Sequence, residues 1–172
     1  MNEIAQFQGA ACPAGGERPL TEGEVALVRS IFGTAIDCSL VTLRRRKWFP
    51  FQPRNRLMAP CGHIHFHPDD SIYCDDFAAA TLDRQGHFLH EMTHVWQTQV
   101  HGKYYLPLRR HPFCRYGYTL MPGRALNRYG IEQQAEIVRH AFLLRNGKRI
   151  AGVGDPRAYD KLVNFPGAEN PG

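Results

Sequence analysis

Two histidines four residues apart, in the segment His90-Glu91-Met92-Thr93-His94, constrain the fold of this chain more than any other feature of its sequence. Residues four apart on an α-helix lie on one face, because 3.6 residues make one turn. Apolar residues recur at helical spacing around the segment: Leu82, Leu89, Met92, Val95 and Trp96. The pattern predicts an amphipathic helix over about residues 81–100 that ends at His101-Gly102.

The histidine pair on this helix has the spacing of a metal site. Two imidazole nitrogens on one helix face can meet one tetrahedral Zn²⁺. Glu91 follows the first histidine, and from there its carboxylate reaches a water molecule beside the metal rather than the metal itself, as a general base must. The sequence therefore predicts a hydrolase with one Zn²⁺ per chain, His90 and His94 as ligands and Glu91 as the catalytic residue.

A catalytic zinc site also needs a third protein ligand. An extended form of the motif would have glycine at position 97 and histidine at position 100, where this chain has Gln97 and Val100. Glu132 and Glu136 are better candidates, since they lie one turn apart in a second helical pattern over residues 131–144. We expect Glu132 to bind zinc and Glu136 to accept a hydrogen bond from a ligand histidine, and the swapped assignment stays open.

The remaining patterns predict one α+β domain. Residues 1–19 are interpreted as a flexible lead-in, 20–152 as the folded domain and 153–172 as a C-terminal tail. Inside the domain, a capping box at Thr21-Glu22-Gly23-Glu24 predicts a helix to about Phe32, and β-branched residues predict a strand over 36–43. We expect a small sheet packed on the active-site helix, with a second helix carrying the third ligand.

The charged residues and the cysteines limit which binding partners and which cellular compartment fit this chain. The formal net charge is +5, and much of it comes from Arg44-Arg45-Arg46-Lys47 with Arg54 and Arg56, interpreted as a solvated face and not as a nucleic-acid site. We find no signal peptide and no membrane span, and expect cytoplasmic synthesis. The five cysteines form no C-x-x-C pair, which argues against a cysteine zinc site, and a Cys61–Cys74 disulfide stays open.

Several segments resemble known metallopeptidases. The motif His90–His94 followed by the acidic pair in residues 132–136 resembles the gluzincin branch of the zincins, in which the first acidic residue is the third ligand and the second supports a histidine. Segments 49–56, 62–68 and 90–97 resemble the VgrG-related metallopeptidase domains of bacterial type VI secretion. The resemblance implies a zincin-like fold, an immunity protein and the secretion machinery as partners, and a toxic effector acting in the periplasm of a target cell.

A strand is predicted ahead of the active-site helix. Polar and apolar residues alternate over 63–67, which puts His63, His65 and His67 on one face, and Pro68 at the end favours an edge strand. An edge strand can pair with an extended peptide. The three histidines are therefore candidates for lining the substrate cleft, although structural histidines or a solvent-facing surface fit the pattern equally well.

The residues leave rival functions open. The prediction is a metallopeptidase that cleaves a peptide or protein substrate, and a cell-wall peptide amidase or peptidase would share its zinc chemistry. A non-catalytic adaptor with a structural zinc would need a fourth ligand. A nuclease using the strand histidines would leave the intact peptidase motif unexplained. Oxyanion support could come from one of four tyrosines, each of which also fits simple packing: Tyr104, Tyr105, Tyr116 and Tyr118.

Overall fold

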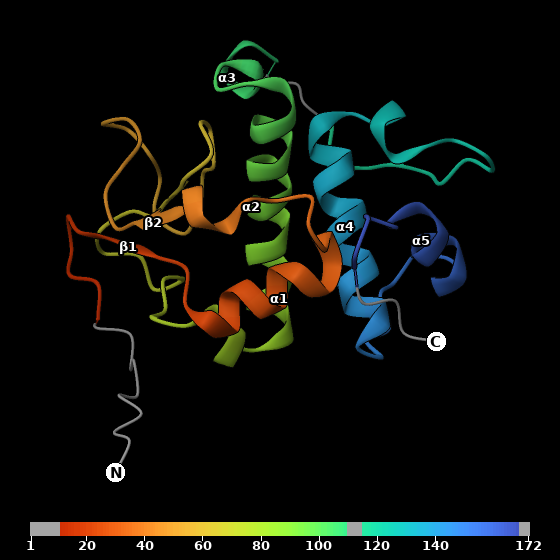
Figure 1. Ribbon diagram of the computed structural model, residues 1–172, viewed down its shortest axis with the longest axis horizontal. Helices are drawn as coiled ribbons and strands as arrows, with labels where there is room; N and C mark the ends of the chain where they lie inside the picture. Colours follow the sequence, from red (N-terminus) through yellow and green to blue (C-terminus); the bar gives the residue numbers. More distant parts are fainter. Residues whose placement is uncertain (1–10, 110–114, 169–172) are drawn as a thin grey trace.

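The computed structural model describes residues 11–109 and 115–168. The helices are α1 (Glu22–Phe32), α2 (Leu82–His101), α3 (Tyr105–Arg109), α4 (Ile131–Arg145) and α5 (Pro156–Leu162), and the strands are β1 (Glu17–Pro19), β2 (Thr42–Arg44) and β3 (Ile64–His65). Helices α2 and α4 pack side by side, with the small sheet on one side of α2 and α5 beyond α4 (Figure 1). The predicted α+β class is confirmed. None of the described helices combines the length and the apolarity that a membrane span requires.

The capping box predicted for α1 is present. Thr21 accepts a hydrogen bond from the Glu24 backbone N–H at 3.0 Å, and the Glu24 carboxylate accepts one from the Thr21 backbone at 2.9 Å. The same carboxylate is fully buried and holds both terminal nitrogens of Arg18 at 2.8 Å. Since Arg18 lies in β1, residues 17–19 belong to the folded domain, and the predicted flexible lead-in ends earlier than expected.

The strands are shorter than predicted. The sheet order is β1-β2-β3, with β1 antiparallel and β3 parallel to β2. Asp37 caps a 3₁₀ turn at Cys38–Leu40 by accepting from the Ser39 N–H, so the predicted strand over 36–43 begins only at Thr42. The predicted edge at residues 63–67 is also partly covered, because His65 exchanges two backbone hydrogen bonds with Met58, at 2.8 and 3.1 Å.

Aromatic stacking and one glycine bring the layers together. The rings of Phe66, Phe77 and Phe88 stack in a row, with centroids 5.7 and 5.1 Å apart, and link the sheet to α2. Gly86 lies where α4 crosses α2, and a Cβ there would be 3.3 Å from a carbon of Arg139 and 3.4 Å from one of Leu143. A glycine inside the helix costs about 1 kcal/mol relative to alanine, and here it permits the close approach of α4.

The C-terminal segment belongs to the core, which corrects the prediction of a tail from residue 153. Helix α5 starts at Pro156, and Tyr159, Val163 and Phe165 are buried. The Phe165 ring packs against Phe32 and Trp96, with centroids 4.9 and 5.1 Å apart. These contacts connect helices distant in sequence, so no local pattern predicts them. The predicted loose end at residues 171–172 lies outside the described residues.

Four cysteines of the described residues are free thiols: Cys12, Cys38, Cys61 and Cys74. The structure therefore contains no Cys61–Cys74 disulfide.

The buried ring of His65 gives the fold a pH dependence. Burial lowers the pKa of His65 from 6.5 to about 4, although its hydrogen bond to the Arg46 carbonyl partly opposes this shift. Only the unfolded chain is then protonated between these values, so the stability that this group contributes is complete above pH 6.5 and is lost as pH falls towards 4. Between pH 6.5 and pH 4, we expect the urea midpoint of the His65→Gln variant to fall less than that of the unmodified chain. An unchanged slope would contradict this assignment.

Candidate metal centre

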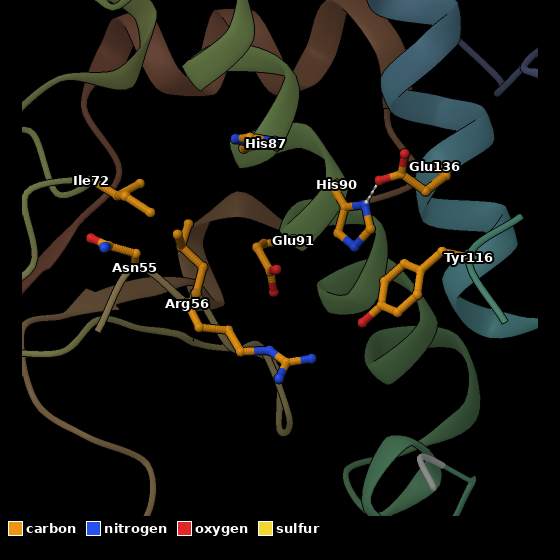
Figure 2. Close-up of a pocket in the computed structure, with 9 residues that line it drawn as sticks. Asn55, Arg56, Ile72, His87, His90, Glu91, Tyr116 and Glu136 are labelled. Atoms are coloured by element: carbon orange, nitrogen blue, oxygen red, sulfur yellow. Dashed lines mark ion pairs between the residues drawn. The ribbon is translucent and has the colours of Figure 1, made fainter. Parts of the chain in front are cut away.

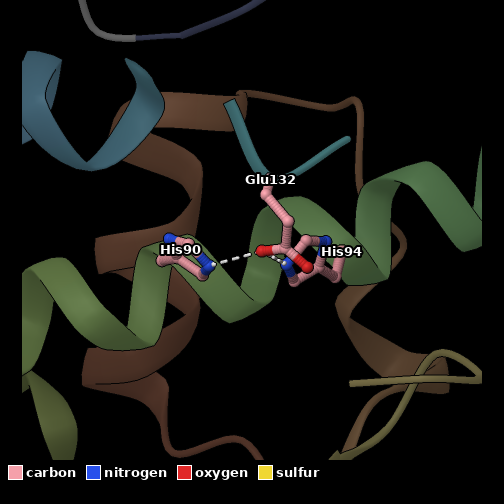
Figure 3. Close-up of side chains that lie close together, drawn as sticks. All are labelled: His90, His94 and Glu132. Atoms are coloured by element: carbon pink, nitrogen blue, oxygen red, sulfur yellow. Dashed lines mark hydrogen bonds and ion pairs between the residues drawn. The ribbon is translucent and has the colours of Figure 1, made fainter. Parts of the chain in front are cut away.

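Helices α2 and α4 bring His90, His94 and Glu132 together in the interior (Figure 3). The Glu132 Oε2 atom lies 3.2 Å from Nε2 of His94 and 3.4 Å from Nε2 of His90. One ligand atom of each residue lies within 4.8 Å of the other two, so the group could hold a metal ion. The three predicted ligands therefore converge. The three residues are at most 8% exposed, so little solvent competes with a ligand in the cluster.

Gln97 fixes the orientation of this cluster. Nδ1 of His94 lies 2.9 Å from Gln97 Oε1, an acceptor, so the ring donates from Nδ1 and turns Nε2, the nitrogen that could bind a metal ion, towards Glu132. The Gln97 amide nitrogen donates to the Ile131 carbonyl and the Gln134 side chain, both at 3.0 Å. Gln97 thus joins α2 to the first turn of α4. Sequence reasoning used this residue only to dismiss the extended motif, and missed its role.

Glu136 lies behind the other histidine. Its Oε1 atom is 2.8 Å from Nδ1 of His90, an ion-pair contact on the far side of the ring from Glu132 (Figure 2). Burial would raise the pKa of Glu136, but His90, Arg139 and His140 outweigh it and lower the pKa to about 2. This is the geometry expected if Glu132 is the ligand and Glu136 the supporting residue, and not the reverse.

The charges around His90 favour a cation. Burial would lower the pKa of His90, but the carboxylates of Glu132, Glu136 and Glu91 outweigh it and raise the pKa to about 9. Three carboxylates close to two imidazoles leave an excess of negative charge in a site with little solvent. A proton or a metal ion can neutralise that excess, and the set of two nitrogens and one oxygen suits a divalent metal.

A cavity of about 200 Å³ opens beside the cluster (Figure 2). Its lining combines residues of α2 and α4 and Tyr116 with residues from the segments before and after β3: Asn55, Arg56, Leu57, Ile72, His87, His90, Glu91, Tyr116 and Glu136. Glu91 is only 7% exposed, and its Oε2 atom has no hydrogen-bond partner among the described residues. A carboxylate with one unpaired oxygen at the wall of a cavity is available to bind and move a proton.

The strand histidines do not line this cavity. Nδ1 of His63 lies 3.0 Å from the Thr42 hydroxyl, and Nδ1 of His67 accepts from the Asp69 N–H at 3.2 Å. His65 is 4% exposed and contacts the Arg46 carbonyl. The structure thus gives all three residues local partners near the sheet, as expected for structural histidines.

Of the four candidate tyrosines, Tyr116 is the one that lines the cavity. Its ring lies nearly parallel to that of His90, with centroids 6.4 Å apart. Tyr118 instead contacts His140 at 2.5 Å and Tyr159 at 2.9 Å, and Tyr105 stacks on His101. Neither Tyr116 nor Arg56 could be singled out from the sequence, because both come from irregular segments without a periodic pattern.

Comparison with known proteins identifies the family. No protein-family model matches the sequence. The solved effector domain of Pseudomonas aeruginosa VgrG2b superposes with a TM-score of 0.66 at 39% identity, covering 81% of this chain and 82% of that one. The chain belongs to the family of the VgrG2b effector domain. This membership confirms the relationship to VgrG-related domains that segments 49–56, 62–68 and 90–97 predicted.

The full-length VgrG2b of Pseudomonas aeruginosa, a type VI secretion system spike protein, is 41% identical over 163 residues. The match takes in 87% of this chain but only 15% of VgrG2b. The similarity to VgrG2b therefore concerns its effector region and not the whole spike protein.

Proposed function

We propose that this chain is a zinc-dependent metallopeptidase that acts as a toxic effector of type VI secretion. The convergence of the two Nε2 atoms of His90 and His94 with the Glu132 carboxylate, next to a cavity walled by Glu91, carries the proposal. The relationship to the VgrG2b effector domain supports the effector role.

The donor set favours a catalytic zinc over a structural one. Structural zinc sites close with four protein ligands, whereas catalytic sites use three and leave a position open. No fourth histidine, cysteine or carboxylate joins this cluster within residues 11–109 and 115–168. The adjoining cavity gives a substrate access to the open position. These features support an enzyme rather than the adaptor module considered above.

Each side chain of the centre has a role in the proposed hydrolysis of a peptide bond. His90, His94 and Glu132 would hold Zn²⁺, which would supply Lewis acidity for a peptide carbonyl and would lower the pKa of a water molecule towards about 7. Glu91 takes a proton from that water and returns it to the leaving amine. Glu136 holds the His90 ring, Gln97 holds the His94 ring, and the Tyr116 hydroxyl stands at the cavity where it can donate to the developing oxyanion.

Delivery and substrate follow from the effector role. The proposed partners are the secretion machinery, which carries the effector, and an immunity protein, which protects the producing cell. The proposed substrate is a peptide or protein of the target cell's periplasm. A cell-wall peptide amidase or peptidase with the same centre is the second candidate.

Metal analysis with a peptide-library digest tests the proposal. We expect one zinc per chain, cleavage that chelation abolishes and zinc restores, and digestion of linear peptides in preference to cell-wall peptides. Glu132→Ala should lose bound zinc, whereas Glu136→Gln should keep it with about 10- to 100-fold weaker affinity. Zinc bound equally by both variants, or a zinc-loaded protein that cleaves neither peptides nor cell-wall fragments, would overturn it.

A further inference from the structure

The positive charge of this chain is concentrated in one segment. Residues 38–68 hold six of the 21 basic residues and none of the 16 acidic ones, so without this segment the formal charge of +5 would become −1. Two of the six cations face inward or along the sheet: Arg45 donates to the Cys12 and Pro68 carbonyls, and Arg44 pairs with Glu17. The other four lie in exposed positions, where Arg46 also pairs with Glu17 and Arg54 lies 3.5 Å from Asp69: Arg46, Lys47, Arg54 and Arg56.

The same segment exposes three aromatic rings. In the loop of residues 46–56, here named the basic aromatic loop, Trp48 is 43% exposed, Phe49 38% and Phe51 86%. The loop follows β2 and extends from the sheet side of the molecule, away from α4 and α5 (Figure 1). These rings do not line the candidate active-site cavity. Side chains this apolar are kept in water only at a cost, so their clustering indicates a surface that is covered in use.

One buried side chain holds the basic aromatic loop in shape. Of residues 46–56, Gln52 alone is buried, at 3% exposure. Its Oε1 atom accepts from the Trp48 N–H at 2.8 Å, and its Nε2 atom donates to the carbonyls of Arg56 at 3.0 Å and His65 at 3.2 Å. The rings are therefore presented by a fixed backbone, and docking them requires little ordering of the chain.

We propose that the basic aromatic loop docks on the surface of an anionic lipid bilayer. Trp and Phe rings favour the boundary between headgroups and acyl chains, while Lys and Arg attract anionic headgroups. The loop offers both chemistries, with three rings between two pairs of cations over eleven positions and no acidic residue among them. Stacking of nucleic-acid bases would use the same residue types in a groove, whereas these rings project from a turn whose Gln52 N–H donates to the Phe49 carbonyl.

Docking in this way would orient the candidate metal centre. Arg56 ends the basic aromatic loop and also lines the candidate active-site cavity. The mouth of that cavity would then lie next to the headgroups, where peptides tethered to the membrane surface are accessible. The docking itself does not depend on the proposed peptidase activity.

Vesicle sedimentation tests this inference on the full chain. We expect binding to vesicles with about one third phosphatidylglycerol, weak binding to pure phosphatidylcholine, and release by salt. Phe51→Ser should lower the affinity tenfold or more, and Lys47→Gln or Arg54→Gln about fivefold each. Leu108→Ser is the matched control, because Leu108 is 84% exposed but lies on α3, and it should bind like the unmodified chain.

Tryptophan emission gives a second readout. The chain has two tryptophans, and Trp96 packs on Phe165, so a shift of emission to shorter wavelength on adding anionic vesicles should disappear in Trp48→Phe. Equal binding to both vesicle types, or equal affinities of the Phe51→Ser and Leu108→Ser variants, would overturn the inference. Displacement from vesicles by a single-stranded oligonucleotide would overturn it in favour of nucleic-acid binding.

Discussion

Replacing Glu91 with glutamine is expected to lower kcat for peptide hydrolysis by about 10²- to 10⁴-fold while bound zinc stays at its normal level. Glutamine keeps the size of the side chain but cannot take a proton from water. The buried Oε2 atom of Glu91 has no hydrogen-bond partner among the described residues, so the substitution breaks no observed contact of that atom. Steady-state kinetics on a cleaved peptide, together with metal analysis of the same sample, measures both quantities.

Asp83→Asn is the matched control for this variant. Asp83 lies on the same helix, is 56% exposed and pairs only with Lys148 among the described residues. The Asp83→Asn variant should keep kcat within about twofold of the unmodified chain, because exposed ion pairs contribute little to stability. Full activity in zinc-loaded Glu91→Gln would exclude Glu91 as the general base. Loss of zinc from this variant would instead show that Glu91 supports the metal.

The largest effect on stability is expected at Glu24. Its carboxylate is fully buried against Arg18 and also accepts hydrogen bonds from the backbones of Thr21 and Phe77, the latter at 2.9 Å. Glu24→Gln leaves the Arg18 guanidinium, which stays charged at any ordinary pH, buried without its counter-charge. Breaking one partner of such a pair costs about 3–5 kcal/mol. Urea unfolding monitored by circular dichroism measures this loss.

Glu17→Gln gives the comparison for an exposed pair. Glu17 binds Arg44 at 3.2 Å and Arg46 at 2.6 Å, but its side chain is 44% exposed. We expect a loss below about 1 kcal/mol. Similar losses in the Glu17 and Glu24 variants would contradict the argument that burial decides the effect.

Helices α1, α2 and α4 were predicted well because their signals are local, whereas the shorter helices α3 and α5 were not predicted. The capping box before α1, the apolar spacing in α2 and the acidic pair in α4 each lie within a few turns of chain, and all three helices formed within two residues of the expected bounds. Strands were predicted poorly, because β2 and β3 are set by pairing between distant segments. The role of Phe165 could not be predicted either, since its partners lie on other elements.

The residues of the candidate site also fall into those that local patterns predict and those that depend on the whole fold. His90, His94 and Glu132 were predicted together, because helical spacing determines which face each residue occupies, and they meet in the structure. Tyr116 reaches the cavity from an irregular segment whose path depends on the whole fold. The strand histidines were candidates because polar and apolar residues alternate over 63–67. This alternation predicts that the histidines share one face of a strand, but it does not predict what that face contacts.

Two helices share the candidate metal centre, and the spacing between them depends on a position that contributes nothing to coordination. Gly86 lies one turn before His90, where the α2 backbone meets the side chains of Arg139 and Leu143 of α4 and has no side chain of its own to hold them off. The distance between the candidate ligands His90 on α2 and Glu132 on α4 therefore depends on the absence of a side chain at position 86. In this chain, a glycine that cannot itself bind a metal ion helps to set the spacing of the candidate metal ligands.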